Sequence, residues 1–434
     1  MNYQEIASKA KTEWDEMTNG RVPLIRIGTA MCGHAAGAFR VLETLKEYME
    51  SKGIEANVQE VGCLGLCYAE PLVDIKKPGK SRLFFNNVGP EDISKIIDEY
   101  LVSDGYPKEK VFGYLGEEGP QEDEASLESM PGMRLQNRIA LRNAGHTSPY
   151  DINQYIANGG YSGLNKALSN MSPTDVIDEV KNSGLRGRGG AAFPTGVKWS
   201  FLVGSPGPTK YILCNCEEGD PGAYNDKGIL ESDPHTLLEG LAIAGYATGA
   251  SNGVVFIRHG HDGPINRTEK AIEQAYESGL LGENILGTDF SFDIEVALTG
   301  ESYVAGEETA LMEAVEGKRS MPRYRPPFPA AFGVWGKPSN INNVKSLSYA
   351  PEIISRGADW FSSIGVNQST GTAIVCLSGD VNRPGLYEVP MGLTLGEVID
   401  DLGGGVSTAG QLKLLQQGGP LGGGLGPASK TINM

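Results

Sequence analysis

The sequence of 434 residues is poor in cysteine and in positive charge, and both shortages exclude classes of protein. Its six cysteines are too few and too unevenly spaced for the disulfide framework of a secreted protein, which favours a reducing, cytoplasmic setting. Its 37 lysines and arginines are outnumbered by 54 aspartates and glutamates, so the net charge is −17 with histidine neutral. A surface of that sign repels phosphate backbones, and we expect no nucleic-acid partner.

A hydrophobic run long enough to cross a membrane is also missing. The most apolar stretch, residues 241–257, is interrupted by Gly245, Gly249 and Gly253 and by polar side chains, so it predicts a helix, a turn and a strand. The first residues have neither the basic start nor the apolar stretch of a signal peptide. We therefore expect no direct membrane span.

The apolar pattern predicts an α/β protein with several folded parts. Residues 1–105 alternate short apolar runs with helical stretches and form a first α/β domain. Residues 106–150 are interpreted as a linker and helical lead-in, because residues 117–128 are acidic and contain a Gly-Pro pair. Residues 151–362 form the central α/β domain, and residues 363–434 a smaller third one.

Individual elements follow from the same pattern. In the first domain we expect strands at 25–27, 56–61, 72–75 and 81–85, with helices at 38–51 and 90–101. In the central domain we expect strands at 210–214, 253–258 and 292–298, with a helix at 236–247. In the third domain we expect strands at 373–378, 385–389 and 412–416, with a helix at 394–402.

Glycine is abundant, with 59 residues or about twice its ordinary share, and it gathers in one informative segment at 184–201. Gly187-x-Gly189-x-x-Ala192 fits a loose dinucleotide fingerprint, but it follows a predicted helix instead of a strand, so an ordinary Rossmann interpretation fails. Glycines still let backbone amides approach a phosphate or a flat ring. The alternative is a flexible surface loop. The segment's candidate binding residues are Gly187, Arg188, Gly189, Gly190, Phe193, Lys198 and Phe201.

Three further segments carry chemistry-bearing residues. Asn215, Glu217, Glu218 and Asp220 end a predicted strand, where they suit ribose hydroxyls, a metal or plain solvent exposure; the lack of a neighbouring histidine favours hydroxyl or amide recognition. The acidic residues after Gly306 have the ordinary explanation that they complement a helix dipole. The remaining candidates are Tyr303, Gly306, Glu307, Glu308, Arg325, Phe328, Asn342 and Asn343.

In order and spacing, these segments together resemble the NADH-binding flavoprotein subunit of respiratory complex I and the related diaphorase subunits of NAD-linked hydrogenases and formate dehydrogenases. The resemblance covers roughly residues 134–424. It implies a Rossmann-like FMN- and NAD(H)-binding domain at 151–362 and a β-grasp, SLBB-type domain at 363–434. The chain as given ends at Met434, before the four-cysteine domain of relatives, so we expect no terminal [4Fe-4S] cluster here.

The resemblance also assigns roles. Hydride transfer would occur at the flavin, with no protein residue acting as acid or base. The implied flavin contacts are Gly187, Gly189, Gly190, Lys198, Asn215, Tyr303, Gly306, Asn342 and Asn343. The implied adenine-side walls are Phe193, Phe201 and Phe328, with Arg325 replacing a usual lysine. The implied ribose and nicotinamide contacts are Glu218, Asp220, Glu307 and Glu308. If Glu217, Glu218 and Asp220 line the ribose, they would repel a 2′-phosphate, which favours NAD over NADP.

The first domain resembles thioredoxin-like [2Fe-2S] ferredoxins. Cys63 and Cys67 match the second half of their ligand pattern, and Cys32 is the third implied metal ligand. The fourth would fall near Ile27 or Gly37, neither of which binds iron, so the ligand set is incomplete; His34 is an alternative donor.

We therefore expect a flavoprotein subunit that transfers hydride between NAD(H) and FMN and passes single electrons to iron–sulfur carriers. Its partners would be iron–sulfur redox subunits of a hydrogenase, a formate dehydrogenase or a similar reductase. The alternative is a degenerate flavin-binding, scaffold or relay subunit without nicotinamide turnover. The departures at Ala192, Asp220 and His259 motivate that alternative.

Overall fold

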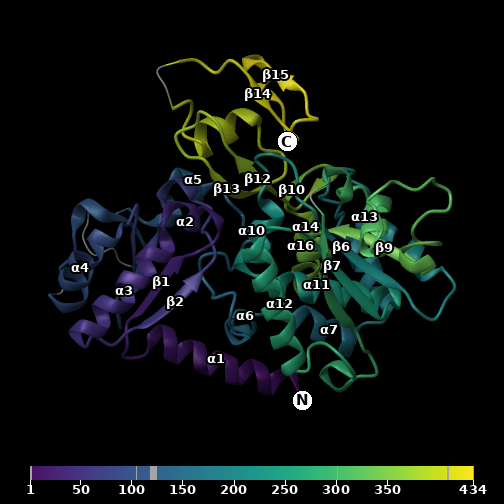
Figure 1. Ribbon diagram of the computed structural model, residues 1–434, viewed down its shortest axis with the longest axis horizontal. Coiled ribbons are helices and arrows are strands. Elements are labelled where there is room, and N and C mark those ends of the chain that lie inside the picture. The colour runs from purple at the N-terminus through teal and green to yellow at the C-terminus, as the bar shows by residue number, and fades with distance from the viewer. Residues whose placement is uncertain (1, 104, 118–124, 301, 408–409, 434) are drawn as a thin grey trace.

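A mixed five-stranded sheet organises the N-terminal unit of the computed structural model, which describes residues 2–103, 105–117, 125–300, 302–407 and 410–433 (Figure 1). The strand order is β2-β1-β3-β4-β5; β1 and β2 are parallel and the other pairs antiparallel. This topology is compatible with the thioredoxin-like prediction, and the four expected strands and two expected helical stretches are present. The strands are β1 Leu24–Gly28, β2 Asn57–Val61, β3 Val73–Lys76, β4 Arg82–Phe85 and β5 Val111–Leu115. The helices are α2 Met31–Ala36, α3 Ala38–Lys52 and α4 Ile93–Ile96, and α4 continues as a π-helix over Ile97–Val102.

Two segments depart from the predicted boundaries of this unit. Strand β5 lies beyond residue 105 and completes the first sheet by pairing with β4. Helix α1 (Tyr3–Asn19) contacts both this unit and the central unit: the Tyr3 hydroxyl donates to the carbonyl of Gly160 at 2.8 Å, and the Met17 sulfur accepts from Gln59 of β2 at 2.8 Å. Most of the acidic segment lies outside the described residues, but Leu127 at its end is fully buried. The acidic composition predicted a linker, but hydrophobic contacts bury the end of this segment in the folded protein.

A four-stranded parallel sheet organises the central unit. Its order is β8-β7-β6-β9, and all three expected strands are present. The strands are β6 Tyr211–Cys216, β7 Asn252–Arg258, β8 Asp293–Thr299 and β9 Ser339–Asn343. The helices include α6 Ile152–Ala157, α7 Ser162–Asn170, α8 Pro173–Asn182, α9 Thr195–Val203, α10 Asn225–Ser232, α11 Pro234–Thr248, α12 Asp262–Glu277, α13 Glu308–Val315, α14 Val344–Ser348, α15 Ala350–Arg356 and α16 Ala358–Ser362.

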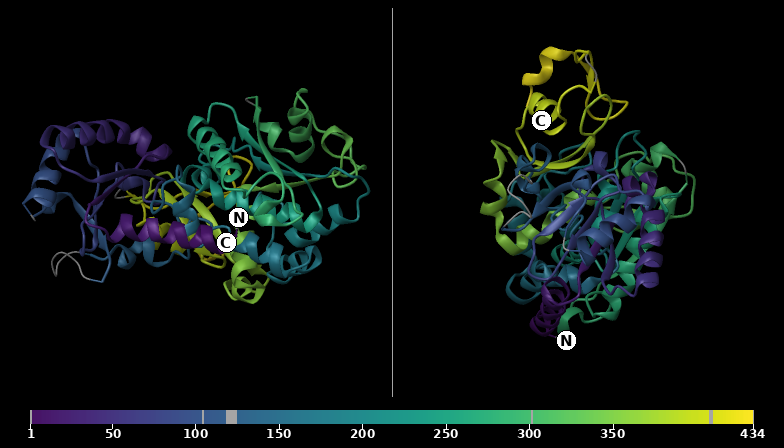
Figure 2. Two further views of the ribbon diagram at one scale, coloured as in Figure 1. Left: turned by 90° about the horizontal axis from the view of Figure 1, so that it is seen from below. Right: turned by 90° about the vertical axis from the view of Figure 1, so that its left-hand side faces the viewer.

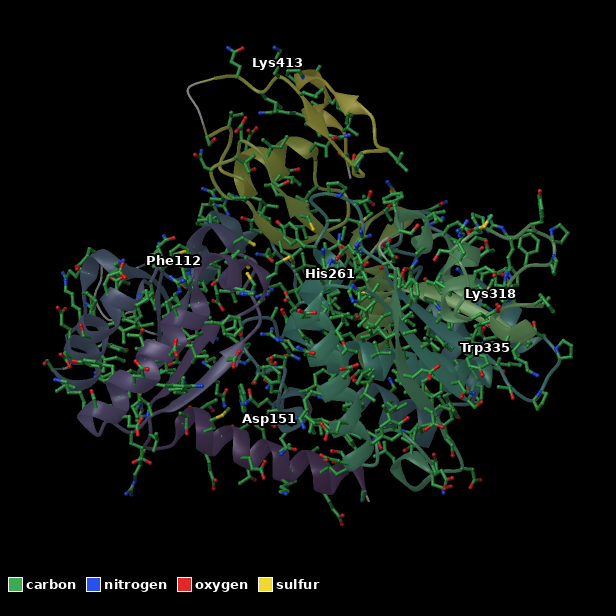
Figure 3. All side chains as sticks on the ribbon, viewed as in Figure 1. Phe112, Asp151, His261, Lys318, Trp335 and Lys413 are labelled. Carbon is green, nitrogen blue, oxygen red and sulfur yellow. The ribbon has the colours of Figure 1, made fainter. Side chains whose placement is uncertain are left out.

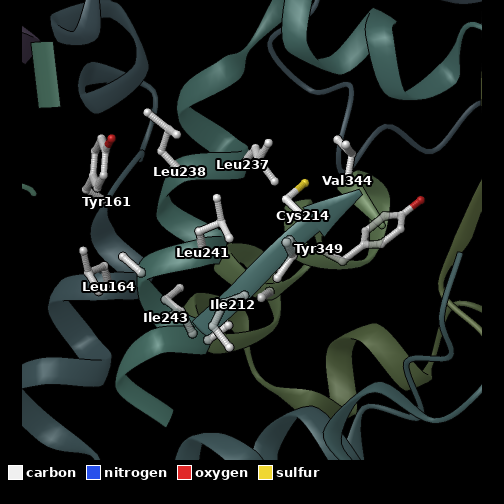
Figure 4. Close-up of a cluster of buried hydrophobic side chains, with 14 of the residues drawn as sticks. Tyr161, Leu164, Ile212, Cys214, Leu237, Leu238, Leu241, Ile243, Val344 and Tyr349 are labelled. Atoms are coloured by element: carbon white, nitrogen blue, oxygen red, sulfur yellow. The ribbon is translucent and has the colours of Figure 1, made fainter. Parts of the chain in front are cut away.

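Helix α11 lies in the hydrophobic core of this unit. Nearly all its residues are buried, because helices surround it on the sides that the sheet does not cover. Figure 4 shows its Leu237, Leu238 and Leu241 beside Ile212 and Cys214 of β6. The thiols of Cys214 and Cys216 are fully buried among apolar side chains, which supports packing as their role.

The C-terminal unit is smaller and stands at the top in Figure 1 and in the right-hand view of Figure 2. Strands β12 (Thr372–Leu377) and β13 (Gly385–Pro390) pair antiparallel, and β14 (Leu415–Gln416) pairs with β15 (Gly424–Leu425). The expected helix at 394–402 is present as a π-helix over Glu397–Leu402. Among the residues described, no helix combines the length and apolar character needed to cross a membrane.

A buried carboxylate joins the C-terminal unit to the segment before the central unit. Glu388 of β13 is fully buried and accepts hydrogen bonds from the backbone amides of Ile139, Ala140 and Leu141. The hydroxyl of Thr372 donates to the same carboxylate at 2.6 Å. These bonds fix residues 137–141 against β13.

We expect Glu388→Ala to lower the free energy of unfolding by roughly 3 kcal/mol, because it leaves three buried amides without an acceptor. Chemical denaturation followed by circular dichroism measures this loss. Glu47→Ala, at an exposed position on α3, is the control and is expected to change little. Equal stability of the two variants would contradict the role of Glu388.

Candidate functional site

The strand order of the central sheet places a topological switch point between β6 and β9. The chain runs from β6 outward to β7 and β8, and returns to add β9 on the other side of β6. In open α/β sheets, ligands bind outside the carboxyl ends of the strands at such a point. The pairing brings Asn215 directly opposite Asn343 and Cys214 opposite Asn342. Two predicted segments therefore meet there.

The glycine-rich loop lies over the same point. It is closed by the amide of Gly187, which donates to the carbonyl of Phe193 at 2.8 Å. The amide of Arg188 donates to the Ser346 hydroxyl of α14 at 2.9 Å. A Cβ atom on Gly189 would lie 3.1 Å from the Asn343 Cβ, so only glycine allows this approach without displacement. Residues 189–193 are exposed on their outer side, where a planar ligand could lie.

The segment around Gly306 reaches the end of β6. The Asn215 side-chain amide donates to the carbonyl of Gly306 at 2.8 Å, and a Cβ on Gly306 would lie 3.1 Å from a Glu217 carboxylate oxygen. Glu217 forms an ion pair with Arg258 at the end of β7. The four predicted segments thus converge on one sheet edge, although about 160 residues separate the first from the last.

A buried ion pair that the sequence analysis missed supports this edge. The Lys345 ammonium lies 2.7 Å from the Asp226 carboxylate, and the Asn343 amide donates to the same carboxylate at 2.6 Å. Asp226 is 5% exposed and Lys345 8% exposed. No periodic or spacing signal links a helix start at 226 to one at 345, because the pairing depends on the β6–β9 contact.

Two predicted contacts are engaged inside the protein. The Glu218 carboxylate accepts the amides of Asp226 and Lys227 at 3.0 Å and caps α10; burial raises the pKa of this carboxyl. It is 8% exposed and already holds two amides, and its role as a ribose or nicotinamide contact stays a prediction. Asn342 accepts from the Trp199 indole of α9 at 3.2 Å and donates to Asn340 at 2.8 Å, and its role as a flavin contact stays a prediction.

The remaining predicted residues form an accessible rim around the edge. Lys198 and Arg325 both pair with Glu308, and Glu307 caps α13 through the amides of Thr309 and Ala310. Tyr303 donates to Asp220 at 2.9 Å.

Three exposed aromatic side chains lie on the predicted segments, two of them close together. The rings of Phe193 and Phe201 lie 5.9 Å apart, and Phe328 is 61% exposed. The labelled Lys318 and Trp335 in Figure 3 mark the outer side of this part of the molecule, away from the N-terminal unit. Exposed aromatic faces beside paired charges suit a coenzyme with both rings and polar groups.

The three predicted thiols come together in the N-terminal unit. The sulfur atoms of Cys32, Cys63 and Cys67 lie within 4.8 Å of one another, and the amide of Gly65 points at the Cys63 sulfur at 3.2 Å. Hydrogen bonds from Cys32 and Cys63 lower the pKa of Cys67 to about 4. His34 is exposed and packs edge-on against Phe39, outside this group. The thiols fit a thiophilic metal centre.

The thiol group lies beside the central unit. Tyr224, directly before α10, helps to lower the pKa of Cys67, and its amide points at the Cys376 sulfur of β12 at 3.3 Å. Its hydroxyl also donates to the carbonyl of Gly385 at 2.9 Å. Tyr224 thus contacts all three units and connects the thiols to the helix that carries Asp226.

Comparisons with known proteins match two segments to described families. Residues 180–352 match the Nuo51 FMN-binding domain, and residues 374–423 match the SLBB domain. In fold, the chain is similar to the NAD⁺-reducing [NiFe]-hydrogenase in its H2-reduced state, with a TM-score of 0.60 and 26% identity over 99% of this chain and 69% of that chain.

Curated relatives agree with these matches. The chain is 51% identical over 301 residues to the NADP-reducing hydrogenase subunit HndC of Solidesulfovibrio fructosivorans, covering 69% of this chain and 61% of that protein. It is 46% identical over 281 residues to an NADH-quinone oxidoreductase subunit of Rhizobium meliloti (strain 1021), covering 65% of this chain and 67% of that protein. It is 41% identical over 272 residues to an NADH-quinone oxidoreductase subunit of Escherichia coli (strain K12), covering 62% and 61%. The matched part thus spans about three fifths to two thirds of these relatives.

We expect Lys345→Met to destabilise the protein by about 3–5 kcal/mol, because it leaves the buried Asp226 carboxylate without its cation. The double variant Asp226→Asn, Lys345→Met should recover much of that loss, which a double-mutant cycle by chemical denaturation measures. Lys318→Met is the control and should have a much smaller effect, because Lys318 is exposed and its partner Glu316 keeps an ion pair with Arg323. Strict additivity of the two single changes would contradict the coupling.

Proposed function

Because the chain belongs to the family of complex I and hydrogenase subunits built on the Nuo51 FMN-binding and SLBB domains, we propose that it exchanges electrons between NAD(H) and iron–sulfur carriers through bound FMN. The observation that carries the proposal is the convergence at the β6–β9 switch point. The glycine-rich loop, the end of β6, the Gly306 segment and the end of β9 all meet there. A site assembled from four distant segments is typical of a large, flat cofactor and not of a surface loop.

Bound FMN would convert between the two-electron hydride of NAD(H) and the single electrons that iron–sulfur centres accept. The chain's own residues hold and shield the reacting rings. The backbone of residues 187–190 can approach a phosphate or ring closely, and Arg188 and Lys198 bring positive charge. Asn215, Gly306 and Asn343 line the facing side. Because hydride transfer needs no protein acid or base, the proposed role of these residues is orientation and water exclusion.

The rim is the proposed binding place for NAD(H). Phe193, Phe201 and Phe328 offer exposed ring faces for an adenine. Glu307 and Glu308 lie beside Arg325, where they can accept hydroxyl or amide protons. Tyr303 and Asp220 complete the rim through their shared hydrogen bond.

We also propose that the chain works within a larger redox complex in the cytoplasm. Its partners would be iron–sulfur subunits of a hydrogenase, a formate dehydrogenase or a similar reductase. The relatives' names support a complex, since they are subunits of quinone oxidoreductases and of a hydrogenase. The six free cysteines support a reducing compartment.

The chain loaded with FMN should lose the flavin's visible absorption when NADH is added without oxygen. Gly189→Val should lower the affinity for FMN by about tenfold or more, or about 1.4 kcal/mol, because its side chain meets Asn343 and the ligand face. Gly204→Ala, where an added Cβ meets nothing within 4 Å, is the matched control. Flavin fluorescence titration measures both affinities.

If bound FMN is not reduced by excess NADH but is reduced by a reduced ferredoxin, the nicotinamide step fails. That result would favour the degenerate relay subunit instead. At Ala192 and Asp220 the sequence differs from the family pattern, and we expect a loss of nicotinamide turnover to originate at these two residues. Ala192 already lies at a φ of 53°, which glycine adopts more easily.

Preference for NADH over NADPH should depend on Asp220. Glu218 is buried, and Glu217 is paired with Arg258. Of these three carboxylates, Asp220 is therefore the one that can repel a 2′-phosphate. Asp220→Asn should lower the ratio of kcat/KM with NADH to kcat/KM with NADPH by roughly three- to tenfold. Steady-state flavin-dependent dye reduction with each coenzyme measures the ratio. An unchanged ratio would remove Asp220 from coenzyme selection.

A further inference from the structure

The thiol group in the N-terminal unit has three sulfur donors, whereas iron–sulfur clusters of the ferredoxin type use four ligands. None of the three residues considered from the sequence takes the fourth position. Ile27 is fully buried in the sheet core, Gly37 has no side chain, and His34 points to the exposed side. The fourth donor, if there is one, must come from another segment.

Glu70, three residues after Cys67, places a carboxylate at this group. One of its oxygens lies 3.9 Å from the Cys32 sulfur, and the other accepts the Leu72 amide at 2.8 Å. The side chain also interacts with Cys63. Glu70 therefore contacts the Cys32 thiol, and only 6% of Glu70 is exposed.

Nothing among the described residues neutralises this carboxylate. No ion pair to Glu70 occurs in the described part of the chain, and its one backbone donor is the Leu72 amide. A buried carboxylate without a cation lowers the stability of the folded protein unless it coordinates a metal or is protonated. Asp74 on the same sheet differs, because Arg26 and Arg82 both pair with it.

The glycine that ends β1, before Cys32, leaves room for the Glu70 carboxylate. A Cβ on Gly28 would lie 3.0 Å from both of its oxygens. A Cβ on Gly33, directly after Cys32, would lie 2.0 Å from the Gly28 carbonyl oxygen and 3.3 Å from one carboxylate oxygen, so the backbone is the closer constraint there. An oxygen donor thus lies beside the segment that carries Cys32.

Positive charge near the thiols suits an anionic centre. The Arg138 guanidinium interacts electrostatically with Cys63 and Glu388. Its Nε atom is buried and has no hydrogen-bond partner among the described residues. Together with the Gly65 amide on Cys63, it would stabilise thiolates bound to iron.

We propose that Glu70 is the fourth ligand of a [2Fe-2S] cluster whose other ligands are Cys32, Cys63 and Cys67. The cluster thus has three sulfur donors and one oxygen donor. This inference rests on the proposed function in one respect, which is that the chain carries iron–sulfur chemistry. Its test is separate, because it needs neither nicotinamide nor flavin. Carboxylates are accepted iron ligands, so the donor set is chemically sound.

The test uses the full chain, reconstituted with ferrous iron and sulfide without oxygen. We expect about two iron atoms and two sulfides per wild-type chain, with Glu70→Ala losing at least half of the iron. Glu70→Cys should keep the iron and shift the electron paramagnetic resonance g-values of the reduced cluster, because a thiolate replaces the oxygen donor. Glu60→Gln, a half-buried glutamate of β2 that accepts from Thr29, is the matched control and should behave as wild type.

Folding is checked separately by circular dichroism and by FMN content, since the flavin site lies in another unit. Loss of NADH-dependent flavin bleaching with iron content intact would count against the proposed function and leave Glu70 in place. Wild-type iron content with an unchanged spectrum in Glu70→Ala or in Glu70→Cys would overturn the assignment of Glu70. A wild-type chain that takes one zinc ion and no iron would overturn the cluster.

Discussion

Parallel pairing of β6 with β9 underlies the whole of the proposed flavin site. These strands are more than a hundred residues apart in the chain, yet their register puts Asn215 opposite Asn343. A shift of one residue would turn every side chain of the shifted strand to the other face of the sheet and separate the two asparagines. The Gly189 approach to Asn343 requires this register.

Buried polar groups reinforce that register from behind the site. Lys345 and Asn343 both reach Asp226, and Glu218 holds the first amides of the helix that carries Asp226. Such a network stabilises one arrangement because a shifted strand would leave charges buried without partners. The carboxylates nearest the sheet therefore support the site, and the residues available to a coenzyme lie further out on the rim.

The three units are physically interdependent. Helix α1 belongs in sequence to the first unit but packs with the central one, and Glu388 of the third unit holds the segment at 139–141. Tyr224 contacts Cys67, Cys376 and Gly385 together. The thiol group is consequently fixed in place relative to the central sheet, as electron transfer between two centres in one chain would require.

Local features of the chain were enough to predict the α/β class, most strands of both main sheets and the three cysteines that come together, but they did not predict strands β5 and β9. Those features are apolar periodicity, the cluster of glycines and the spacing of Cys63 and Cys67. Three-dimensional contacts alone established the Asp226–Lys345 pair, the internal engagement of Glu218 and Asn342, and the placement of Glu70 beside Cys32. Each of these depends on which strands become neighbours. Long-range contacts of this kind leave no periodic trace in a single sequence, because the partner of a buried charge is set by strand order and register.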